Sequence, residues 1–263
     1  MLAIDLSGRT AIVVGGSRGI GASIVEHLCR AGAFTVFTHT GNPASAAGVR
    51  ALEAACAPAG SPGAGGGARG EPVDARDGEA MRALADRVAA ERGRIDVLVC
   101  NAGLNAARPV ETQTDAEWRA ATAVNLDSAY FAVRACIPHM LARAWGRIVL
   151  IGSSAVFDGG GGAIAYAAAK AGLTGMKTYL SRNYVKKGIL TNVVHPCVIE
   201  TDLLKQRYAD NEAKRGLIAQ IPVGRLGRPE DVAGLVAFLA SPWGDFICGQ
   251  EIMADGGRTF YGK

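Results

Sequence analysis

The chain has 263 residues, about half of them hydrophobic, with 28 lysines and arginines, 24 aspartates and glutamates and 35 glycines. This composition excludes a disordered or fibrous protein, and the length allows one large core that needs no disulfide or metal. The net charge is +4 and the basic residues are scattered, which argues against the one-sided basic surface of a nucleic-acid-binding protein.

Short apolar runs alternate along the chain with longer segments of helical period. We expect strands at residues 10–14, 34–38, 95–100, 147–152, 190–195 and 251–253. Helices are expected from Gly19 onward, where Ile20, Ile24 and Leu28 share one face, and at residues 78–92, 115–143, 164–187 and 230–240. This alternation predicts an α/β fold with a doubly wound parallel sheet, in a single domain spanning residues 1–263.

Residues 57–70 are rich in glycine and proline and stand where a third strand is expected before Val73. Such a composition is typical of flexible segments. We therefore expect a flexible surface loop that lengthens one helix-to-strand connection.

The six cysteines are separated by 27 residues or more, with no CxxC pair and no Cys/His cluster. This spacing predicts neither a metal site nor a disulfide framework, and it indicates a reducing compartment. Asp5 stands where a secretory signal would need an apolar run. We therefore expect a cytoplasmic protein that has no membrane partner.

The first expected strand runs into the glycine-rich segment GGSRGIG at residues 15–21, which opens the first helix. Glycine permits positive φ in such a turn and lets a pyrophosphate approach the helix N-terminus, where backbone N–H groups and the helix dipole bind anions. The GxxxGxG spacing differs from the common GxGxxG fingerprint, but its place between a strand and an amphipathic helix suits dinucleotide binding. The alternative is a glycine-rich turn that binds no ligand.

Tyr166 and Lys170 lie four residues apart on a segment of helical period, so their side chains leave the same face. A tyrosine with its ordinary pKa of about 10 is a poor acid–base catalyst at neutral pH. A lysine ammonium about 4 Å away would lower that pKa by up to about three pH units, which predicts a catalytic pair. Because YxxxK is common in helices, the alternative is an amphipathic helix with a surface lysine.

Ser153 lies thirteen residues before Tyr166, at the carboxyl end of an expected strand, where open α/β sheets bind ligands. A hydroxyl at this point can donate a hydrogen bond to a carbonyl oxygen that gains negative charge. Ser154 is the adjacent alternative, because strand alternation would point only one of the two into the site. Asn125, on the long helix at 115–143, is a fourth candidate, with an ordinary buried amide as the alternative.

Taken in order, the glycine-rich segment, Asn101-Ala102-Gly103, Asn125, Ser153, Tyr166 and Lys170 resemble the short-chain dehydrogenase/reductase family with its Asn-Ser-Tyr-Lys tetrad. The resemblance extends over nearly the whole chain, from LSG at residues 6–8 to DGG at residues 255–257, and implies a Rossmann-like fold. It implies that Tyr166 transfers the proton, Lys170 lowers its pKa and binds the nicotinamide ribose, Ser153 orients the carbonyl and Asn125 holds a water in a proton relay. Hydride would pass directly between substrate and nicotinamide.

Four positions depart from the usual family pattern: Val14, Cys100, Cys197 and Cys248. The residues usual at the first two positions tie strands together by hydrogen bonds, so these changes bear on stability. Cys197 follows Pro196 close to the expected nicotinamide site, where we expect a small hydrophobic side chain that lines the pocket, with a reactive thiol as the alternative. None of the four changes removes a catalytic group.

The end of the second expected strand reads His39-Thr40, without the carboxylate that usually binds the ribose 2′-hydroxyl of NAD. Because Arg18 in the glycine-rich segment could meet a 2′-phosphate, the sequence favours NADP(H) over NAD(H). Asp74 resembles the adenine contact of the family, with a turn or cap carboxylate as the alternative. The expected cofactor-binding residues are Gly15, Ser17, Arg18, Gly19, Ile20, Gly21, His39, Thr40, Asp74, Asn101, Ala102, Gly103, Tyr166, Lys170, Pro196, Ile199 and Thr201.

The substrate pocket is expected in the loops beyond the strand ends, with a mobile lid at residues 203–223. The residues expected to line this pocket are Ser153, Leu104, Phe157, Asp158, Cys197 and Leu203, with Tyr208 as a further candidate.

By overall pattern, including IPVGRLGRPEDVAGLVAFLAS at residues 221–241, the chain is most similar to reductases of 3-oxoacyl carrier-protein thioesters and related ketoreductases. The expected function is hydride transfer between NADP(H) and a small-molecule ketone or secondary alcohol. One alternative is a sugar or polyol dehydrogenase, and another, of a different class, is a non-catalytic dinucleotide-binding sensor. The resemblance also implies a homotetramer built by pairing the helices at 115–143 and 164–187 across two-fold axes.

Overall fold

The computed structural model describes residues 3–57, 66–201, 204 and 211–261. Within this part of the chain one seven-stranded sheet has the order β3-β2-β1-β4-β5-β6-β7, and every neighbouring pair is parallel. The strands are β1 (Thr10–Val14), β2 (Phe34–His39), β3 (Gly67–Pro72), β4 (Val97–Cys100), β5 (Gly146–Ile151), β6 (Ile189–Pro196) and β7 (Glu251–Ala254). The predicted doubly wound α/β fold is confirmed.

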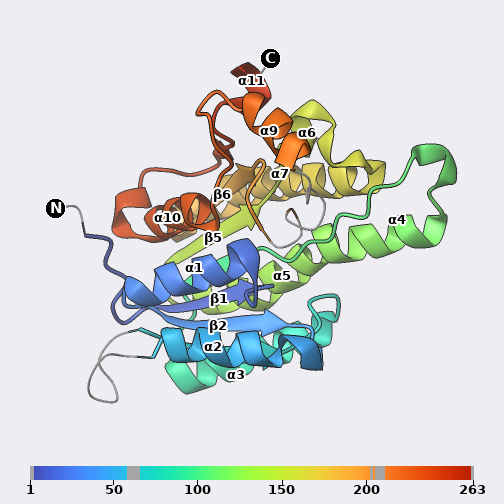
Figure 1. Cartoon of the computed structure of the whole chain (residues 1–263). Coiled ribbons are helices and arrows are strands. Elements are labelled where there is room, and N and C mark those ends of the chain that lie inside the picture. Colours follow the sequence, from blue (N-terminus) through green and yellow to red (C-terminus); the bar gives the residue numbers. More distant parts are fainter. Residues whose placement is uncertain (1–2, 58–65, 202–203, 205–210, 262–263) are drawn as a thin grey trace.

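Helices cover both faces of the sheet (Figure 1). They are α1 (Gly19–Arg30), α2 (Ala46–Ala55), α3 (Gly78–Arg92), α4 (Asp115–Thr122), α5 (Ser128–Leu141), α6 (Ala155–Asp158), α7 (Ile164–Tyr184), α9 (Asn211–Ala219), α10 (Pro229–Ala240) and α11 (Arg258–Tyr261). The helices α1, α2 and α10 pack on one face, and α3, α5 and α7 pack on the other. None of the helices within the described ranges is long and apolar enough to cross a membrane.

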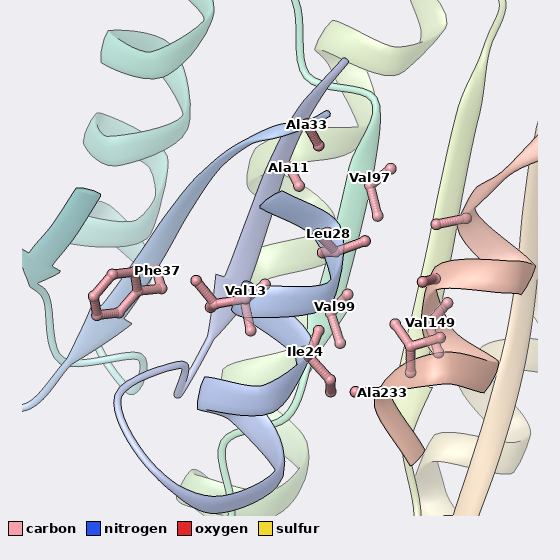
Figure 2. Close-up of a cluster of buried hydrophobic side chains, with 14 of the residues drawn as sticks. Ala11, Val13, Ile24, Leu28, Ala33, Phe37, Val97, Val99, Val149 and Ala233 are labelled. Carbon is pink, nitrogen blue, oxygen red and sulfur yellow. The ribbon is translucent and has the colours of Figure 1, made fainter. Parts of the chain in front are cut away.

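Two hydrophobic clusters, one on each face, hold the sheet between the helices. In β1, Ala11 and Val13 belong to the first cluster, whereas Ile12 and Val14 belong to the second, so alternate side chains of one strand enter opposite layers. Figure 2 shows the first cluster, where Ile24 of α1 lies among strand side chains. Burial on both faces explains why the strands read as continuous apolar runs rather than alternating ones.

The strand order reverses beside β1, because β2 and β3 lie to one side of it and β4 to β7 lie to the other. The segments that leave β1 and β4 at their carboxyl ends therefore diverge to opposite sides of the sheet. Open α/β sheets bind their ligands in the crevice that such a reversal creates. The glycine-rich segment after β1 and Asn101 after β4 both lie at this point.

The prediction that residues 57–70 form a flexible loop is wrong for residues 67–70, which begin β3, and it lies outside the described residues at 58–65. Gly67 to Pro72 pair in register with the whole of β2. A Cβ atom at Gly70 would lie 2.7 Å from a methyl carbon of Val49, so glycine here permits close packing of α2 on the strand. Composition alone suggested flexibility because it carries no signal for pairing with a neighbour.

β3 forms an edge of the sheet, and charged side chains project from it. Arg69 pairs with Glu91 at 2.7 Å, and Glu71 pairs with Arg87 at 2.8 Å. Pro72 ends the strand, and proline offers no N–H to a further strand.

The helix predicted at 115–143 differs in its interior. α4 and α5 are joined by a π-helical segment, Ala123–Asp127, so the helical path continues with one wider turn. Such π segments are rare and frequently occur at functional sites. The helix predicted at 164–187 ends as α7 at Tyr184 and continues as a 3₁₀ turn, Val185–Lys187, and α2 was not predicted.

Candidate active site

The glycine-rich turn joins β1 to α1 and is tied to β2. Gly15 N donates to Thr38 Oγ1 at 3.0 Å, and Gly16 N donates to the Thr38 carbonyl at 3.0 Å. Gly15 has a φ of +76°, and a Cβ atom at Gly21 would collide with the Gly15 carbonyl oxygen. These glycines let β1, α1 and the loop after β4 pack closely together. The N-terminus of a helix held in such a turn is a favourable site for an anion.

The loop after β4 brings a second set of expected residues to the same place. Asn101 Nδ2 donates to the Gly15 carbonyl at 2.7 Å and so joins this loop to the glycine-rich turn. A Cβ atom at Gly103 would lie 3.0 Å from Asn125 Oδ1 and 3.4 Å from Lys170 Nζ. A side chain at position 103 would therefore crowd two of the expected catalytic groups.

Tyr166, near the start of α7, and Ser153, two residues after β5, line the same cavity. Burial raises the pKa of Tyr166 above its ordinary value, although the nearby Ser153 side chain acts in the opposite direction and Cys197 adds to the increase. Ser153 Oγ also accepts a hydrogen bond from Ala155 N at 3.2 Å. Of the two adjacent serines, the structure therefore places Ser153 against the tyrosine; Ser154 is buried, with 5% of its surface exposed.

Lys170 lies one helical turn after Tyr166, with 3% of its surface exposed, and its Nζ donates to the Ile151 carbonyl at 2.7 Å. Burial lowers the pKa of Lys170 to about 8, partly offset by the nearby Cys100. The ammonium lies 6.0 Å from the centre of the Tyr166 ring. The expectation that Lys170 would bring the tyrosine pKa below its ordinary value is wrong, because desolvation of the phenol dominates.

Asn125 lies within the π-helical segment, and its amide is bonded to backbone groups. Nδ2 donates to the carbonyls of Leu104 at 2.8 Å and Ala121 at 2.9 Å, and Oδ1 accepts from Leu104 N at 3.2 Å. These bonds fix the loop that carries Gly103 against Lys170. The water-relay role implied by the family resemblance stays a prediction.

A buried polar chain that the sequence analysis did not identify lies behind Ser153. His195 Nδ1 lies 3.2 Å from Ser153 N, which donates to it, and His195 Nε2 lies 3.1 Å from Glu251 Oε2. Glu251 Oε1 accepts from Lys177 Nζ at 3.0 Å, which connects the chain to α7. Burial lowers the pKa of His195, so the imidazole is neutral at neutral pH. A histidine in the buried strand β6 was the available signal.

A cavity of about 420 Å³ opens at the carboxyl ends of the strands and collects residues from most of these segments. The sequence-predicted residues that line it are Ile20, Asn101, Gly103, Leu104, Ser153, Asp158, Tyr166, Lys170, Pro196, Cys197, Ile199 and Thr201. Residues that were not predicted also line it, among them Asn105, Val198, Leu217 and Arg258. Arg258 stands just after the DGG segment at the end of β7, a position that only the sheet order places beside Tyr166.

Other expected residues lie outside the lining of this cavity. They are Gly15, Ser17, Arg18, Gly19, Gly21, His39, Thr40, Asp74, Ala102, Asn125 and Phe157. The expected residues Leu203 and Tyr208 lie outside the described part of the chain, and the expected lid is described only at residue 204 and from residue 211 onward.

Phe157 and Asp74 have partners that explain their positions. The Phe157 ring packs edge-on against His195, with 5.0 Å between ring centres, rather than into the cavity. Asp74 accepts hydrogen bonds from the backbone and side chain of Arg76, which hold the pKa of its carboxyl below the ordinary value. That geometry fits a turn carboxylate, the alternative considered for this residue.

The site residues fit a nicotinamide dinucleotide. Three structural features agree: a helix N-terminus that follows a glycine-rich turn, a crevice at the reversal of strand order, and a buried lysine ammonium facing the cavity. Gly15 and Gly21 would hold the pyrophosphate end, and Lys170 and Tyr166 lie where the reacting end would meet a substrate.

Comparison with known proteins agrees with this geometry. A family model described as Enoyl-(Acyl carrier protein) reductase matches residues 14–259. The 3-oxoacyl-[acyl-carrier-protein] reductase FabG of Escherichia coli (strain K12) is 36% identical over 254 residues, covering 97% of this chain and 98% of that protein.

Two solved structures extend the comparison to the fold. A candidate NAD(P)-dependent gluconate 5-dehydrogenase from Beutenbergia cavernae, with NADP bound at low occupancy, superposes with a TM-score of 0.88 at 35% identity, covering 98% of this chain and 99% of that chain. The RhlG/NADP active-site complex of Pseudomonas aeruginosa superposes with a TM-score of 0.87 at 30% identity, with coverage of 98% and 99%. The chain therefore belongs to the short-chain dehydrogenase/reductase family and is an NAD(P)-dependent oxidoreductase that acts on carbonyl and alcohol groups.

Proposed function

We propose that this protein reduces the ketone of 3-oxoacyl thioesters or closely related ketones with NADPH. The observation that carries the proposal is the cavity that Ser153, Tyr166 and Lys170 line together at the carboxyl ends of the strands. A protonated phenol in the same cavity as the Lys170 ammonium can give its proton to a carbonyl oxygen as that oxygen gains negative charge. FabG of Escherichia coli, similar over nearly its full length, supports a 3-oxoacyl thioester as the substrate.

In the proposed reaction, Tyr166 and Ser153 hold the substrate carbonyl oxygen by two hydrogen bonds. A bound nicotinamide dinucleotide would supply the hydride that reduces the carbonyl carbon. As the oxygen gains negative charge, Ser153 stabilises it and Tyr166 transfers its proton. Lys170 stabilises the resulting phenolate through its charge, and its bond to Ile151 keeps the ammonium in place.

The decisive assay compares reduction of an acetoacetyl thioester by NADPH with oxidation of a panel of polyols by NADP and NAD. The proposal expects the thioester to have the higher kcat/KM. Turnover of polyols alone would replace it with the second candidate, a sugar or polyol dehydrogenase. That candidate is favoured by one observation, the charged pair Asp158 and Arg258 in the cavity, which would suit a strongly polar substrate.

The preference for NADP(H) is a second part of the proposal. The end of β2 offers His39 and Thr40 but no carboxylate, and Arg18 is exposed at the N-terminus of α1. We expect kcat/KM to be higher with NADPH than with NADH, and Arg18→Ala to reduce that ratio, because a guanidinium pairs well with a 2′-phosphate. Arg30→Ala, at the exposed far end of the same helix, is the control. A higher value with NADH would contradict this part.

We also infer a homotetramer in the cytoplasm, assembled through the α4–α5 and α7 faces. Large apolar side chains are exposed there: Trp118 at 42%, Tyr130 at 49% and Tyr179 at 62%. Light scattering on a sizing column should give four times the chain mass of 27.1 kDa. A monomer mass would contradict the assembly and leave the proposed chemistry intact.

A further inference from the structure

Arg258 lines the same cavity as Tyr166, although the family motifs did not single it out. It begins α11, directly after the turn that follows β7. Asp255 fixes this turn, because its carboxylate accepts hydrogen bonds from Gly257 N at 2.9 Å and Thr259 N at 2.8 Å. The Arg258 side chain is 24% exposed, so most of it is enclosed by protein. The turn that Asp255 fixes therefore holds the Arg258 side chain at the cavity.

The guanidinium makes three contacts, of which the one to the Asp158 carboxylate is long for a charged pair. Nη1 donates to Asp158 Oδ2 at 3.2 Å and to Cys197 Sγ at 3.4 Å, and Nη2 donates to Gln220 Oε1 at 3.2 Å. Bonds between charged N–H groups and carboxylates are typically about 2.7–2.9 Å long. The present partners thus hold the side chain in place without fully satisfying it.

The Nε atom of Arg258 is buried and has no hydrogen-bond partner among the described residues. A buried donor without a partner is unfavourable, and such groups are uncommon in folded proteins. A guanidinium offers five N–H donors, of which only part are used here. An oxygen acceptor supplied by a ligand would satisfy donors that the protein leaves free.

Cys197 links this guanidinium to the reacting hydroxyl. Its sulfur accepts from Arg258, and it lies close enough to Tyr166 to act on the phenol electrostatically. Cys197 therefore interacts with both Arg258 and the proton donor. A substrate whose ketone oxygen bonds to Tyr166 would extend its next carbons past Cys197 toward Arg258.

The charges around the cavity favour an electron-rich substrate group beside Arg258. The charged residues among its described lining are Lys170, Arg258 and Asp158. Asp158 is already engaged, since Oδ1 accepts from Gly160 N at 2.8 Å and Oδ2 accepts from Arg258. An alkyl chain at this place would desolvate the guanidinium without replacing its hydrogen bonds.

From these contacts we propose that Arg258 binds a second oxygen of the substrate, the carboxylate or thioester carbonyl two bonds from the ketone carbon. The site then selects β-oxo acids or β-oxo thioesters over simple ketones. This inference rests on the proposed reduction of a ketone at Tyr166, and it adds the residue that recognises the second carbonyl group.

The test compares three substrates in the NADPH-dependent reaction: acetoacetate, its N-acetylcysteamine thioester, and 4-methyl-2-pentanone, in which an isopropyl group replaces the carboxylate. Arg258→Met keeps the apolar stem and removes the donors. We expect its KM for the β-oxo substrates to rise on the order of 10- to 100-fold, the loss typical of a hydrogen bond to a charged group. The kcat/KM for 4-methyl-2-pentanone should change less than about threefold. Arg225→Met, an exposed arginine that pairs with Asp231 outside the cavity, is the matched control.

Comparing the loss of affinity in Arg258→Met for acetoacetate with that for its thioester identifies the substrate oxygen that Arg258 binds. A larger loss for acetoacetate than for the thioester assigns a carboxylate, and an equal or larger loss for the thioester assigns its carbonyl. Equal losses on all three substrates would show that Arg258 only shapes the cavity, and no loss on any of them would show that it has no role. Either result overturns the inference.

Binding measured without turnover separates this inference from the proposed function. Acetoacetate titrated calorimetrically into the NADP-loaded protein should bind to wild type and lose affinity by a similar factor in Arg258→Met. Arg258-dependent binding without any reduction would refute the proposed reaction and support the oxygen site. Binding that is the same in both proteins would overturn the oxygen site, whatever the turnover shows.

Discussion

Replacing Lys170 with methionine should make the folded protein less sensitive to pH. The ammonium is 3% exposed, and burial lowers its pKa from 10.5 to about 8. At about 1.4 kcal/mol for each pH unit, this difference corresponds to about 3 kcal/mol of unfolding free energy. The protein bears this cost at neutral pH in order to keep a charged group in its active site.

The direction of this pH dependence follows from the number of protons that the folded and unfolded states bind. Unfolded Lys170 keeps its proton up to about pH 10.5, whereas the folded chain releases it near pH 8. Between these values the unfolded state binds more protons, so the free energy of unfolding of the wild type rises with pH. Lys170→Met lacks this contribution. Its stability relative to wild type should therefore be greatest near pH 7 and fall by about 3 kcal/mol toward pH 10.5.

Urea unfolding of both proteins at pH 7, 8, 9 and 10 measures this change. The variant also loses the bond to the Ile151 carbonyl, so the test concerns how the difference varies with pH rather than its absolute value. Lys186→Met, an exposed lysine just after α7, is the control and should show no such trend. A Lys170→Met difference that stays constant across this range would refute the reasoning that burial controls this ammonium.

Three further substitutions test other parts of the site. Tyr166→Phe should lower kcat by roughly 10²- to 10⁴-fold while NADPH affinity, followed by fluorescence, stays nearly unchanged; unaltered turnover would favour the non-catalytic sensor. Gly21→Ala places a methyl group against the Gly15 carbonyl, so NADPH affinity should fall and stability should drop by about 1–3 kcal/mol in urea unfolding. His195→Ala leaves the Ser153 N–H unpaired, which should cost about 1–3 kcal/mol and lower kcat more than it changes the NADPH Kd; an unchanged kcat would contradict a positioning role.

Much of the architecture could be predicted from local patterns. β-branched runs such as Thr10–Val14 and the glycine-rich segment mark their elements directly, because each depends on nearby residues. The start of β3 was assigned to a loop because its sequence, GARGEP, forms a strand only by pairing with β2. The helix α2 likewise lacked a recognisable start, since Ser45 provides no side-chain cap.

In the active site, too, some features could be predicted from the sequence and others could not. The position of Ser153 at a strand end and the family resemblance together were sufficient to expect it in one site with Tyr166, and both line the cavity. The pKa of Tyr166 was predicted in the wrong direction, because sequence gives neither the burial of the phenol nor the distance to Lys170. Arg258 was missed because its approach to the cavity depends on where β7 joins the sheet.

The character of β3 has a consequence for how copies of the chain can associate. Arg69 and Glu71 are held in ion pairs along this margin, and Pro72 removes a donor. A strand from another molecule that paired with β3 would lie beside these charged side chains, and its hydrogen bonds to the edge would be interrupted at Pro72. Growth of the sheet from one molecule into the next is thereby disfavoured at this margin, which protects the protein from edge-to-edge aggregation.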